Sequence, residues 1–308
     1  MNQVMTYEPD VVLHPPRSRA TLKQTFNDYL QVVKPGITLS NMFTAFTGLF
    51  VATKGDPGIS LTLATLVGSS FVVMSGCALN NYIDRDIDQH MERTKARALP
   101  NGRIPEWSVI ALGLLLGLIG VSVLSLFATM TSAYMALVGL FFYVIVYTGL
   151  TKRTTTLSTV IGGISGAMPP LIGWTAATGS IDTMGWVLFA ILFIWQPPHF
   201  LALGMRRVKD YAAAGIPLLP VVYGFKPTKI QIVLWTAAIL PVSIMPYVLG
   251  KENLLYLVAA VILGGMWLVK GLRGFKAEDD AAWASKMFKF SLIYLMAMCV
   301  AMMVGVLF

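Results

Sequence analysis

Charged residues are scarce in this chain of 308 residues. Asp, Glu, Lys and Arg make up 12% of the sequence, whereas hydrophobic residues make up 56%. A soluble domain has about 25% charged residues, so the composition excludes a soluble protein and is typical of an integral membrane protein. The formal net charge is +8. The basic residues follow the loops between apolar runs rather than one patch, which argues against a nucleic-acid partner.

Cysteine is equally scarce, with Cys77 and Cys299 each inside an apolar run. We expect two buried free thiols rather than a disulfide or a metal site. A cleavable signal peptide is also not apparent, because residues 1–24 are polar and contain proline without an apolar segment. These residues are predicted to form a disordered cytoplasmic tail, followed by a single transmembrane domain over 25–308.

Long apolar runs dominate the rest of the chain and predict an all-α polytopic membrane bundle. Each run is close to the roughly 20 residues that a membrane-spanning helix needs. A short amphipathic helix over 25–34 is expected to lie in the membrane interface before the first span. Nine spans are predicted: 37–53, 61–83, 107–127, 132–150, 157–177, 183–204, 229–249, 253–271 and 287–307.

Lysine and arginine are distributed very unevenly over the loops between these nine spans. All but Lys54 and Lys251 of the 23 basic residues fall on one side. The positive-inside rule therefore predicts a cytoplasmic N-terminus and an extracytoplasmic C-terminus. The expected location is a bacterial plasma membrane or an inner mitochondrial membrane, with the polar clusters on the cytoplasmic face.

Two further expectations concern packing. The fifth span is rich in small residues and contains Pro169–Pro170, which predicts a place in the bundle interior. The eighth and ninth spans are rich in Val, Leu and Met and are expected to face lipid.

The most informative stretch follows the second span, from Asn80 to Arg103. Asn80, Asp84 and Asp88 are four residues apart and would share one face of a helix, whereas Asp86 would point elsewhere. Carboxylates in this register repel one another unless a cation lies between them. Mg²⁺ commonly uses one or two carboxylates together with phosphate oxygens. A solvated helix end with scattered charges is the weaker alternative.

Basic residues follow directly, with Arg93, Lys95 and Arg97 in one short loop. Carboxylates for a metal ion beside such a loop indicate a site for a Mg²⁺-bound phosphate. Lys152 and Arg153 follow the fourth span, and a phosphate contact and an ordinary positive-inside pair are equally good interpretations of them. Lys34, before the first span, has the same two interpretations, and the membrane anchor is the favoured one.

A second polar cluster follows the sixth span. His199 comes after Pro197–Pro198, which are expected to break or kink the helix. Taken alone, His199 would be an interfacial histidine bonded to a backbone carbonyl, but its neighbours favour a site residue. Those neighbours are Arg206, Arg207, Lys209 and Asp210. The two arginines are equally well explained as headgroup anchors. The matching positions of the two clusters suggest two halves that face one cavity.

Several motifs together resemble a known family. The stretches NNYIDRDID and ERTKARALPNGRI resemble the first aspartate-rich motif of the UbiA-type intramembrane prenyltransferases. The stretches YTGLTKR, GGISGAMPPLIGW, WQPPHF and RRVKDYAAAGIPLLPVV are similar to the protoheme IX farnesyltransferase branch of that superfamily. The resemblance covers most of residues 30–250.

The resemblance implies farnesyl transfer from farnesyl diphosphate to a vinyl group of heme b, with addition of water, to give heme O and diphosphate. Heme A synthase or a terminal oxidase would be the downstream partner. The implied roles, by residue, are Mg²⁺ ligation by Asn80, Asp84 and Asp88; diphosphate binding by Arg93, Lys95, Arg97, Lys152 and Arg153; heme binding by His199, Arg206 and Arg207; and a catalytic contribution from Lys209 and Asp210.

This sequence departs from the wider superfamily in two places. Asn81 stands where many relatives have another aspartate, which removes one possible carboxylate. The second loop has His199, Lys209 and Asp210 in place of an aspartate-rich motif, which favours heme over a hydroxybenzoate as the acceptor. Two alternatives are a prenyltransferase acting on a quinone precursor and a cation transporter using intramembrane carboxylates.

Overall fold

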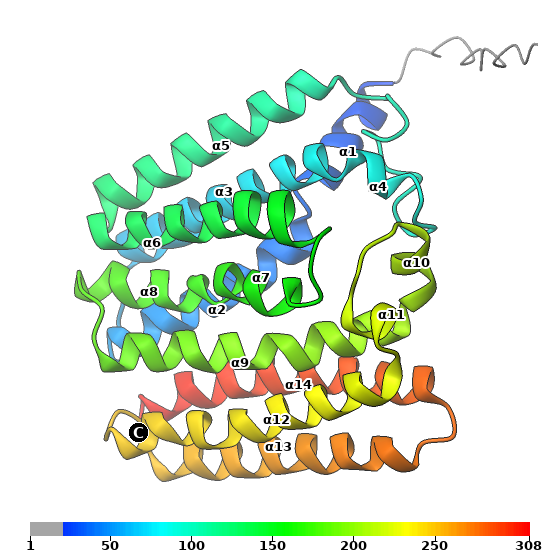
Figure 1. Ribbon diagram of the computed structural model, residues 1–308. Helices are drawn as coiled ribbons and strands as arrows, with labels where there is room; N and C mark the ends of the chain where they lie inside the picture. Colours follow the sequence, from blue (N-terminus) through cyan, green and yellow to red (C-terminus); the bar gives the residue numbers. More distant parts are fainter. Residues whose placement is uncertain (1–20) are drawn as a thin grey trace, which may run out of the picture.

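The computed structural model describes residues 21–308, which fold into a bundle of helices without a β-strand (Figure 1). The predicted disordered tail lies outside the described residues up to position 20. Its last three residues belong to the first helix, α1 (Leu22–Val32), which therefore begins earlier than the predicted interfacial helix. The exposed side chains of α1 include Leu22, Phe26 and Leu30, as expected for a helix at a membrane interface.

Eight helical segments of the described chain are long and apolar enough to cross a membrane. Their bounds lie close to eight of the nine predicted spans, except that the last begins well before position 287. They are α3 (Ile59–Ile83), α5 (Glu106–Phe127), α6 (Met130–Phe141) continued by the π-helix η1 (Phe142–Thr151), α7 (Ser158–Gly166) with α8 (Met168–Thr178), α9 (Thr183–Arg206), α12 (Phe225–Val248), α13 (Leu254–Arg273) continued by η2 (Gly274–Lys276), and α14 (Asp280–Gly305).

The predicted first span corresponds to α2 (Pro35–Ala52), which is not among these eight segments. It packs mainly against α8 and α3. The contact with α8 depends on two glycines. A Cβ on Gly48 would lie 2.0 Å from the Pro170 carbonyl oxygen, and one on Gly173 would lie 1.9 Å from that of Ala45. Larger residues at these positions would therefore force the two helices apart.

The fifth predicted span is a bent pair of helices in the bundle interior, as expected. The bend is at Ala167, between α7 and α8, and Pro169–Pro170 stand in the first turn of α8. Proline is tolerated there because the first backbone N–H groups of a helix have no partner within the helix. In contrast, Pro197–Pro198 do not break α9, which is continuous through them.

The prediction that the ninth span faces lipid fits only one side of α14, on which Ile293 and Val300 are exposed. One face of α14 is buried and includes Met287, Tyr294 and Met298, and the helix packs against α9, α13 and α2. Helix α13 matches its prediction better, because Val258, Ile262 and Met266 are exposed. Apolar composition alone did not distinguish the two helices, since Met and Leu suit both lipid and a protein interior.

Short helices gather at one end of the bundle, on the right in Figure 1. They are α1, α4 (Arg85–Asp88), α10 (Val208–Ala213) and α11 (Leu219–Val222), whereas the C-terminus lies at the opposite end. The loops after α4 and α9 touch through Met91, Ile216 and Leu218, which form a small apolar cluster. The two polar stretches singled out in the sequence are therefore neighbours in space.

One carboxylate lies far from both polar stretches, in the loop between α12 and α13. Glu252 is 8% exposed, and both of its oxygens are buried without a hydrogen-bond partner among the described residues. A Cβ on Gly305 would lie 2.0 Å from Glu252 Oε2, so α14 covers the carboxylate closely. Burial raises the pKa of Glu252 from 4.5 to about 8.

This raised pKa predicts that Glu252→Gln stabilises the protein increasingly as pH rises. Between about pH 4.5 and 8 the folded state retains a proton that the unfolded state releases, so the wild-type protein loses stability through that window. The melting temperature of the variant in detergent should exceed that of the wild type most at pH 8 and least near pH 5. Glu278→Gln, at an exposed position, is the control. A pH-independent difference for Glu252→Gln would contradict the prediction.

Candidate active site

The two aspartates of the first motif lie where α3 ends. Helix α3 stops at Ile83, Asp84 follows as its C-cap, and α4 begins at Arg85. The helix is therefore interrupted at Asp84. The expected four-residue register is nonetheless kept, because the Asp84 N–H bonds to the Asn80 carbonyl and the Asp88 N–H to the Asp84 carbonyl, each at 2.9 Å. Asp84 and Asp88 are both buried, with exposed fractions of 2% and 3%.

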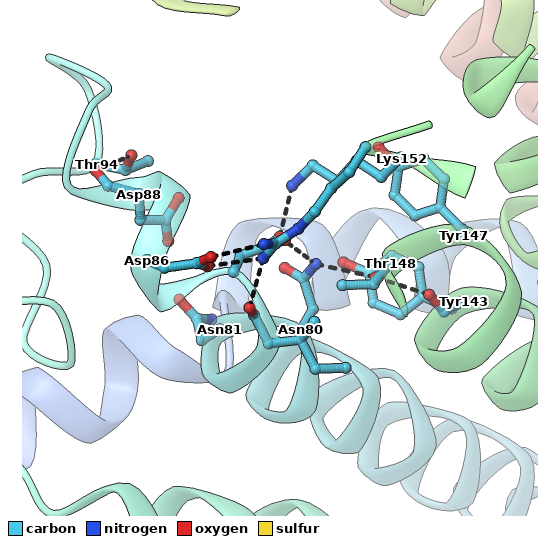
Figure 2. Close-up of polar contacts among 12 residues, drawn as sticks. Asn80, Asn81, Asp86, Asp88, Thr94, Tyr143, Tyr147, Thr148 and Lys152 are labelled. Carbon is cyan, nitrogen blue, oxygen red and sulfur yellow. Dashed lines mark hydrogen bonds and ion pairs between the residues drawn. The ribbon is translucent and has the colours of Figure 1, made fainter. Parts of the chain in front are cut away.

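Asp84 is the centre of a dense set of polar contacts. Its Oδ2 accepts hydrogen bonds from Asn80 Nδ2 at 2.7 Å and from Lys152 Nζ at 2.5 Å. Figure 2 shows Lys152 reaching from the end of η1 toward the end of α3. Asp84 Oδ1 is buried and has no hydrogen-bond partner among the described residues. Arg153 Nη2 lies 3.9 Å from this atom, too far for a hydrogen bond. The oxygen therefore keeps an unused acceptor position that suits a ligand the fold itself does not supply.

Asp88 and Asp86 have different surroundings. Asp88 accepts a hydrogen bond from Arg97 at 2.5 Å. Asp86 points elsewhere, as predicted, and accepts bonds from Arg153 at 2.6 and 2.7 Å. The bonds from Arg153 lower the pKa of Asp86 and raise that of Arg153. Each aspartate thus lies against a basic side chain, and Arg153 also approaches Asp84 Oδ1 at 3.9 Å.

The described residues contain no group of three or more His, Cys, Asp or Glu side chains arranged to hold a metal ion. A divalent ion at this site would therefore need Asp84, Asp88 and the Asn80 amide together with oxygens from a ligand. Mg²⁺ suits this arrangement, because it usually binds one or two carboxylates and completes its shell with water and phosphate oxygens. The free Oδ1 of Asp84 fits such an ion.

The predicted phosphate-binding residues lie in different places. Arg97 reaches Asp88, whereas Lys95 forms an exposed ion pair with Glu92 at 2.6 Å and Arg93 is exposed. Lys152 and Arg153 come from η1 and approach Asp84 and Asp86. Lys152 and Arg97 are therefore the basic side chains nearest the buried carboxylates.

Lys34 belongs to this site, although the sequence favoured a membrane anchor over a phosphate contact for it. Its Nζ donates to Asn80 Oδ1 at 2.6 Å, and burial lowers its pKa to about 8. Its backbone has φ of 49°, an uncommon conformation for a residue other than glycine. The interpretation as a membrane anchor is thus wrong. No sequence pattern indicated the contact, since 46 residues separate Lys34 from Asn80.

Asn81 has a structural contact of its own. Its Nδ2 donates to the carbonyl oxygens of Val32 and Cys77, each at 2.9 Å. The side chain therefore ties α3 to the end of α1. Cys77 and Cys299 are both free and buried, as expected.

A cavity of about 530 Å³ extends into the bundle beside the carboxylates. Tyr143 and Tyr147 line it with their rings stacked at 6.0 Å, on the π-helix that leads to Lys152. A Cβ on Gly76 would lie 2.8 Å from the Tyr143 ring, and one on Gly162 would lie 2.7 Å from the Tyr147 ring. Glycine at these two positions therefore leaves space for the aromatic wall. Most of the remaining lining is apolar.

His199 lies on the wall of the same cavity. Its ring stacks between Trp195 and Phe288, with centroid distances of 4.5 and 4.7 Å. Its Nδ1 lies 2.7 Å from the Ser291 hydroxyl oxygen rather than at a backbone carbonyl. None of these three neighbours was identified from the sequence. Phe288 and Ser291 belong to the distant helix α14, whereas Trp195 lies one turn before His199 on α9.

The other residues of the second cluster do not line the cavity. Arg206 lies over the Phe288 ring at 5.8 Å, and Arg207 pairs loosely with Asp210 at 3.8 Å. Lys209 is exposed on α10. Only Arg206 is therefore linked to the His199 wall by a described contact.

The chain is similar to known proteins over most of its length. Residues 41–293 match the UbiA prenyltransferase family. The chain belongs to that family. A protoheme IX farnesyltransferase of Alkalihalophilus pseudofirmus is 48% identical over 296 residues, covering 94% of each chain. Protoheme IX farnesyltransferase 2 of Bacillus subtilis is 45% identical over 288 residues, covering 92% of this chain and 93% of its own.

Solved structures share the fold of this UbiA-family prenyltransferase. A structure described as digeranylgeranylglyceryl phosphate synthase has a TM-score of 0.77 at 20% identity and covers 92% of this chain and 98% of its own. A UbiA homologue of Archaeoglobus fulgidus bound to DMAPP and Mg²⁺ has a TM-score of 0.62 at 11% identity, covering 89% and 99%. The all-helical membrane fold is therefore confirmed.

The loop that carries Arg97 is held to α1 by one ion pair. Arg103 donates to Asp28 at 2.9 and 3.1 Å and to the Ala96 carbonyl at 3.2 Å. Asp28 is 4% exposed, and its bond raises the pKa of Arg103. The pair thus fixes the loop against the end of the bundle.

We expect Asp28→Ala to destabilise the protein by about 1–3 kcal/mol, because it leaves the Arg103 guanidinium without its partner. The Michaelis constant for the prenyl diphosphate should rise, since the loop that carries Arg97 is loosened. Thermal unfolding and steady-state kinetics would measure both effects. The matched control is Glu92→Ala, which removes an exposed ion pair of the same loop and should change little. Equal effects of the two substitutions would contradict this role of Asp28.

Proposed function

We propose that this prenyltransferase transfers a farnesyl group from farnesyl diphosphate to a vinyl group of heme b. Water is added in the same reaction, and the products are heme O and diphosphate. The relatives at 45–48% identity carry the name protoheme IX farnesyltransferase, which supports this acceptor over a quinone precursor. A cation transporter is disfavoured, because the polar contacts of Asp84 and Asp88 lie at one end of the bundle.

One observation carries the proposal. Two buried aspartates, each paired with a basic side chain, lie beside a largely apolar cavity of about 530 Å³. A prenyl diphosphate has the same division into an anionic head and a long apolar chain. The polar cluster and the cavity are close along the chain in two places. Lys34 and Thr148 contact Asn80, and their near neighbours Gly36 and Tyr147 line the cavity.

We propose Asn80, Asp84 and Asp88 as the residues that would hold Mg²⁺. When bound, Mg²⁺ supplies positive charge that favours departure of the diphosphate. Lys152 and Arg97 would then bind the diphosphate, with Arg93, Lys95 and Arg153 nearby. These fixed cations would stabilise the negative charge that develops on the leaving group in a site with little water.

Bond formation follows from this charge separation. The bond between farnesyl C1 and the diphosphate oxygen breaks, and its electron pair leaves with diphosphate. The vinyl group of heme donates electrons to the allylic carbon and forms the new carbon–carbon bond. Water then adds to the cationic carbon beside the porphyrin and loses a proton. Tyr143 and Tyr147 line the region in which the apolar chain would lie.

For heme, we propose His199 on the cavity wall together with Arg206 and Arg207 at the end of α9. The arginines have the charge to bind the propionates, and Arg206 already lies beside the Phe288 ring that stacks on His199. Lys209 and Asp210 would act from the loop that follows. A heme A synthase or a terminal oxidase would take up the product.

We propose α2 as a ninth membrane crossing in a single domain. Its 18 residues correspond to about 27 Å of helix, close to the thickness of the hydrocarbon core. An odd number of crossings agrees with the separation of α1 and the C-terminus at opposite ends of the bundle (Figure 1). With the basic loops in the cytoplasm, the N-terminus and the active site would be cytoplasmic and the C-terminus extracytoplasmic in a cell membrane.

Extracted hemes provide the direct test of the reaction. Cells that express the protein should contain a heme heavier than heme b by one farnesyl group and one hydroxyl group, and cells without it should not. Purified protein should form the same product from farnesyl diphosphate and heme b. Prenylation of a quinone precursor with unchanged heme would overturn the proposal, as would cation flux through proteoliposomes without any transfer.

The metal assignment predicts that Asp84→Ala and Asp88→Ala each reduce transfer by about 100-fold or more, in line with the loss of a group that stabilises developing charge. Excess EDTA should stop turnover, and added Mg²⁺ should restore it. Asp86→Ala is the comparison variant and should lose much less activity, because this neighbouring aspartate is exposed and pairs with Arg153 rather than with Lys152 or Arg97. If both buried-site variants retain near-normal activity, the metal assignment is wrong.

A further inference from the structure

The His199 ring is held on three sides in a buried position. Trp195 and Phe288 cover its two faces, and Nδ1 contacts the Ser291 hydroxyl at 2.7 Å. The Trp195 indole N–H also donates to the Ser291 backbone carbonyl at 2.8 Å. A residue on α14 thus fixes both the histidine and one of its stacking partners.

The direction of the bond between His199 and Ser291 follows from counting hydrogens. A serine hydroxyl has one hydrogen to donate. Ser291 donates it to the Phe288 carbonyl at 2.6 Å, three residues earlier on α14. The Ser291 oxygen must therefore accept the bond from His199, so Nδ1 carries a hydrogen.

A neutral imidazole has a single N–H group, so a hydrogen on Nδ1 leaves a lone pair on Nε2. Among the described residues, no hydrogen-bond partner of Nε2 accompanies the Nδ1 contact. Because His199 contributes to the cavity wall, the nitrogen with the lone pair is the one available to a ligand in the cavity. A histidine that binds a metal commonly has its other ring nitrogen fixed in this way.

We propose that Ser291 is a positioning residue that holds His199 in the Nδ1–H form and presents Nε2 to the iron of the heme substrate. This inference rests on the proposed function, because it requires heme as the acceptor. Binding through Nε2 would fix the porphyrin against the His199 wall. The hydrogen bond to Ser291 would also raise the basicity of the ligating nitrogen.

The decisive substitution is Ser291→Ala, which removes the hydroxyl but keeps the backbone carbonyl that accepts from Trp195. Ser291→Thr retains a hydroxyl and is the conservative variant. The matched control is Ser243→Ala, which removes a buried serine hydroxyl on α12 that contacts Tyr294 rather than His199. All variants are compared as full-length protein in detergent after confirmation of equal helix content.

The probe is heme b, titrated in the ferric form by absorption and examined in the ferrous form by resonance Raman. We expect histidine ligation in the wild type, about tenfold weaker heme binding in Ser291→Ala and a lower iron–histidine stretching frequency. Ser291→Thr should restore both, and Ser243→Ala should match the wild type. The stretching frequency reports the hydrogen bond at Nδ1, which a general loss of packing does not change.

The outcomes separate this inference from the proposed function. Wild-type protein that binds heme through histidine, with Ser291→Ala unchanged in affinity and frequency, overturns the role of Ser291 alone. Wild-type protein that binds heme without histidine ligation, while still farnesylating it, also overturns this inference and leaves the proposed reaction intact. Failure of the wild type to farnesylate heme would instead contradict the proposed function.

Discussion

The burial of two aspartates at the end of α3 is the constraint on which the rest of the site depends. A carboxylate taken out of water must be paired, and removal of a partner from a buried ion pair typically costs about 3–5 kcal/mol. Asp84 therefore forms an ion pair with Lys152 at the end of η1, and Asp88 forms one with Arg97 in the following loop. Lys34, between α1 and α2, reaches the same cluster through Asn80. Segments far apart in the sequence are thereby held at one end of the bundle.

Close helix packing shapes the space beside this cluster. Gly48 and Gly173 let α2 and α8 approach until backbone touches backbone. Gly76 and Gly162 instead leave space for the rings of Tyr143 and Tyr147. Small residues therefore bring α2 and α8 together in one place and accommodate aromatic rings in another. His199 and Phe288 of α14 also line the cavity. The cavity is thus largely apolar, and its wall continues along the chain to the polar cluster, an arrangement that suits the proposed substrate with its charged head and long chain.

Much of this was predictable from the sequence, in particular the membrane-spanning segments, the buried carboxylates and the basic residues near them. These features depend on local composition and on spacing along one helix. The errors arose where the continuity or the burial of a helix depended on residues distant in the sequence. Pro197–Pro198 are accommodated inside α9, and one face of α14 packs against other helices although its composition equally suits lipid. In each case neighbouring helices decided the outcome.

The sequence by itself determined the all-helical membrane architecture and the identity of the carboxylates, because hydropathy and side-chain charge are properties of short stretches. Only the tertiary structure decided which partners those residues have. Lys34 meets Asn80 across 46 positions, and Ser291 meets His199 across 92. Such pairs depend on the packing of whole helices, since each side chain reaches its partner only after the bundle has brought their backbones within a few ångströms. The geometry that could bind a metal ion and a planar acceptor is therefore a property of the assembled bundle.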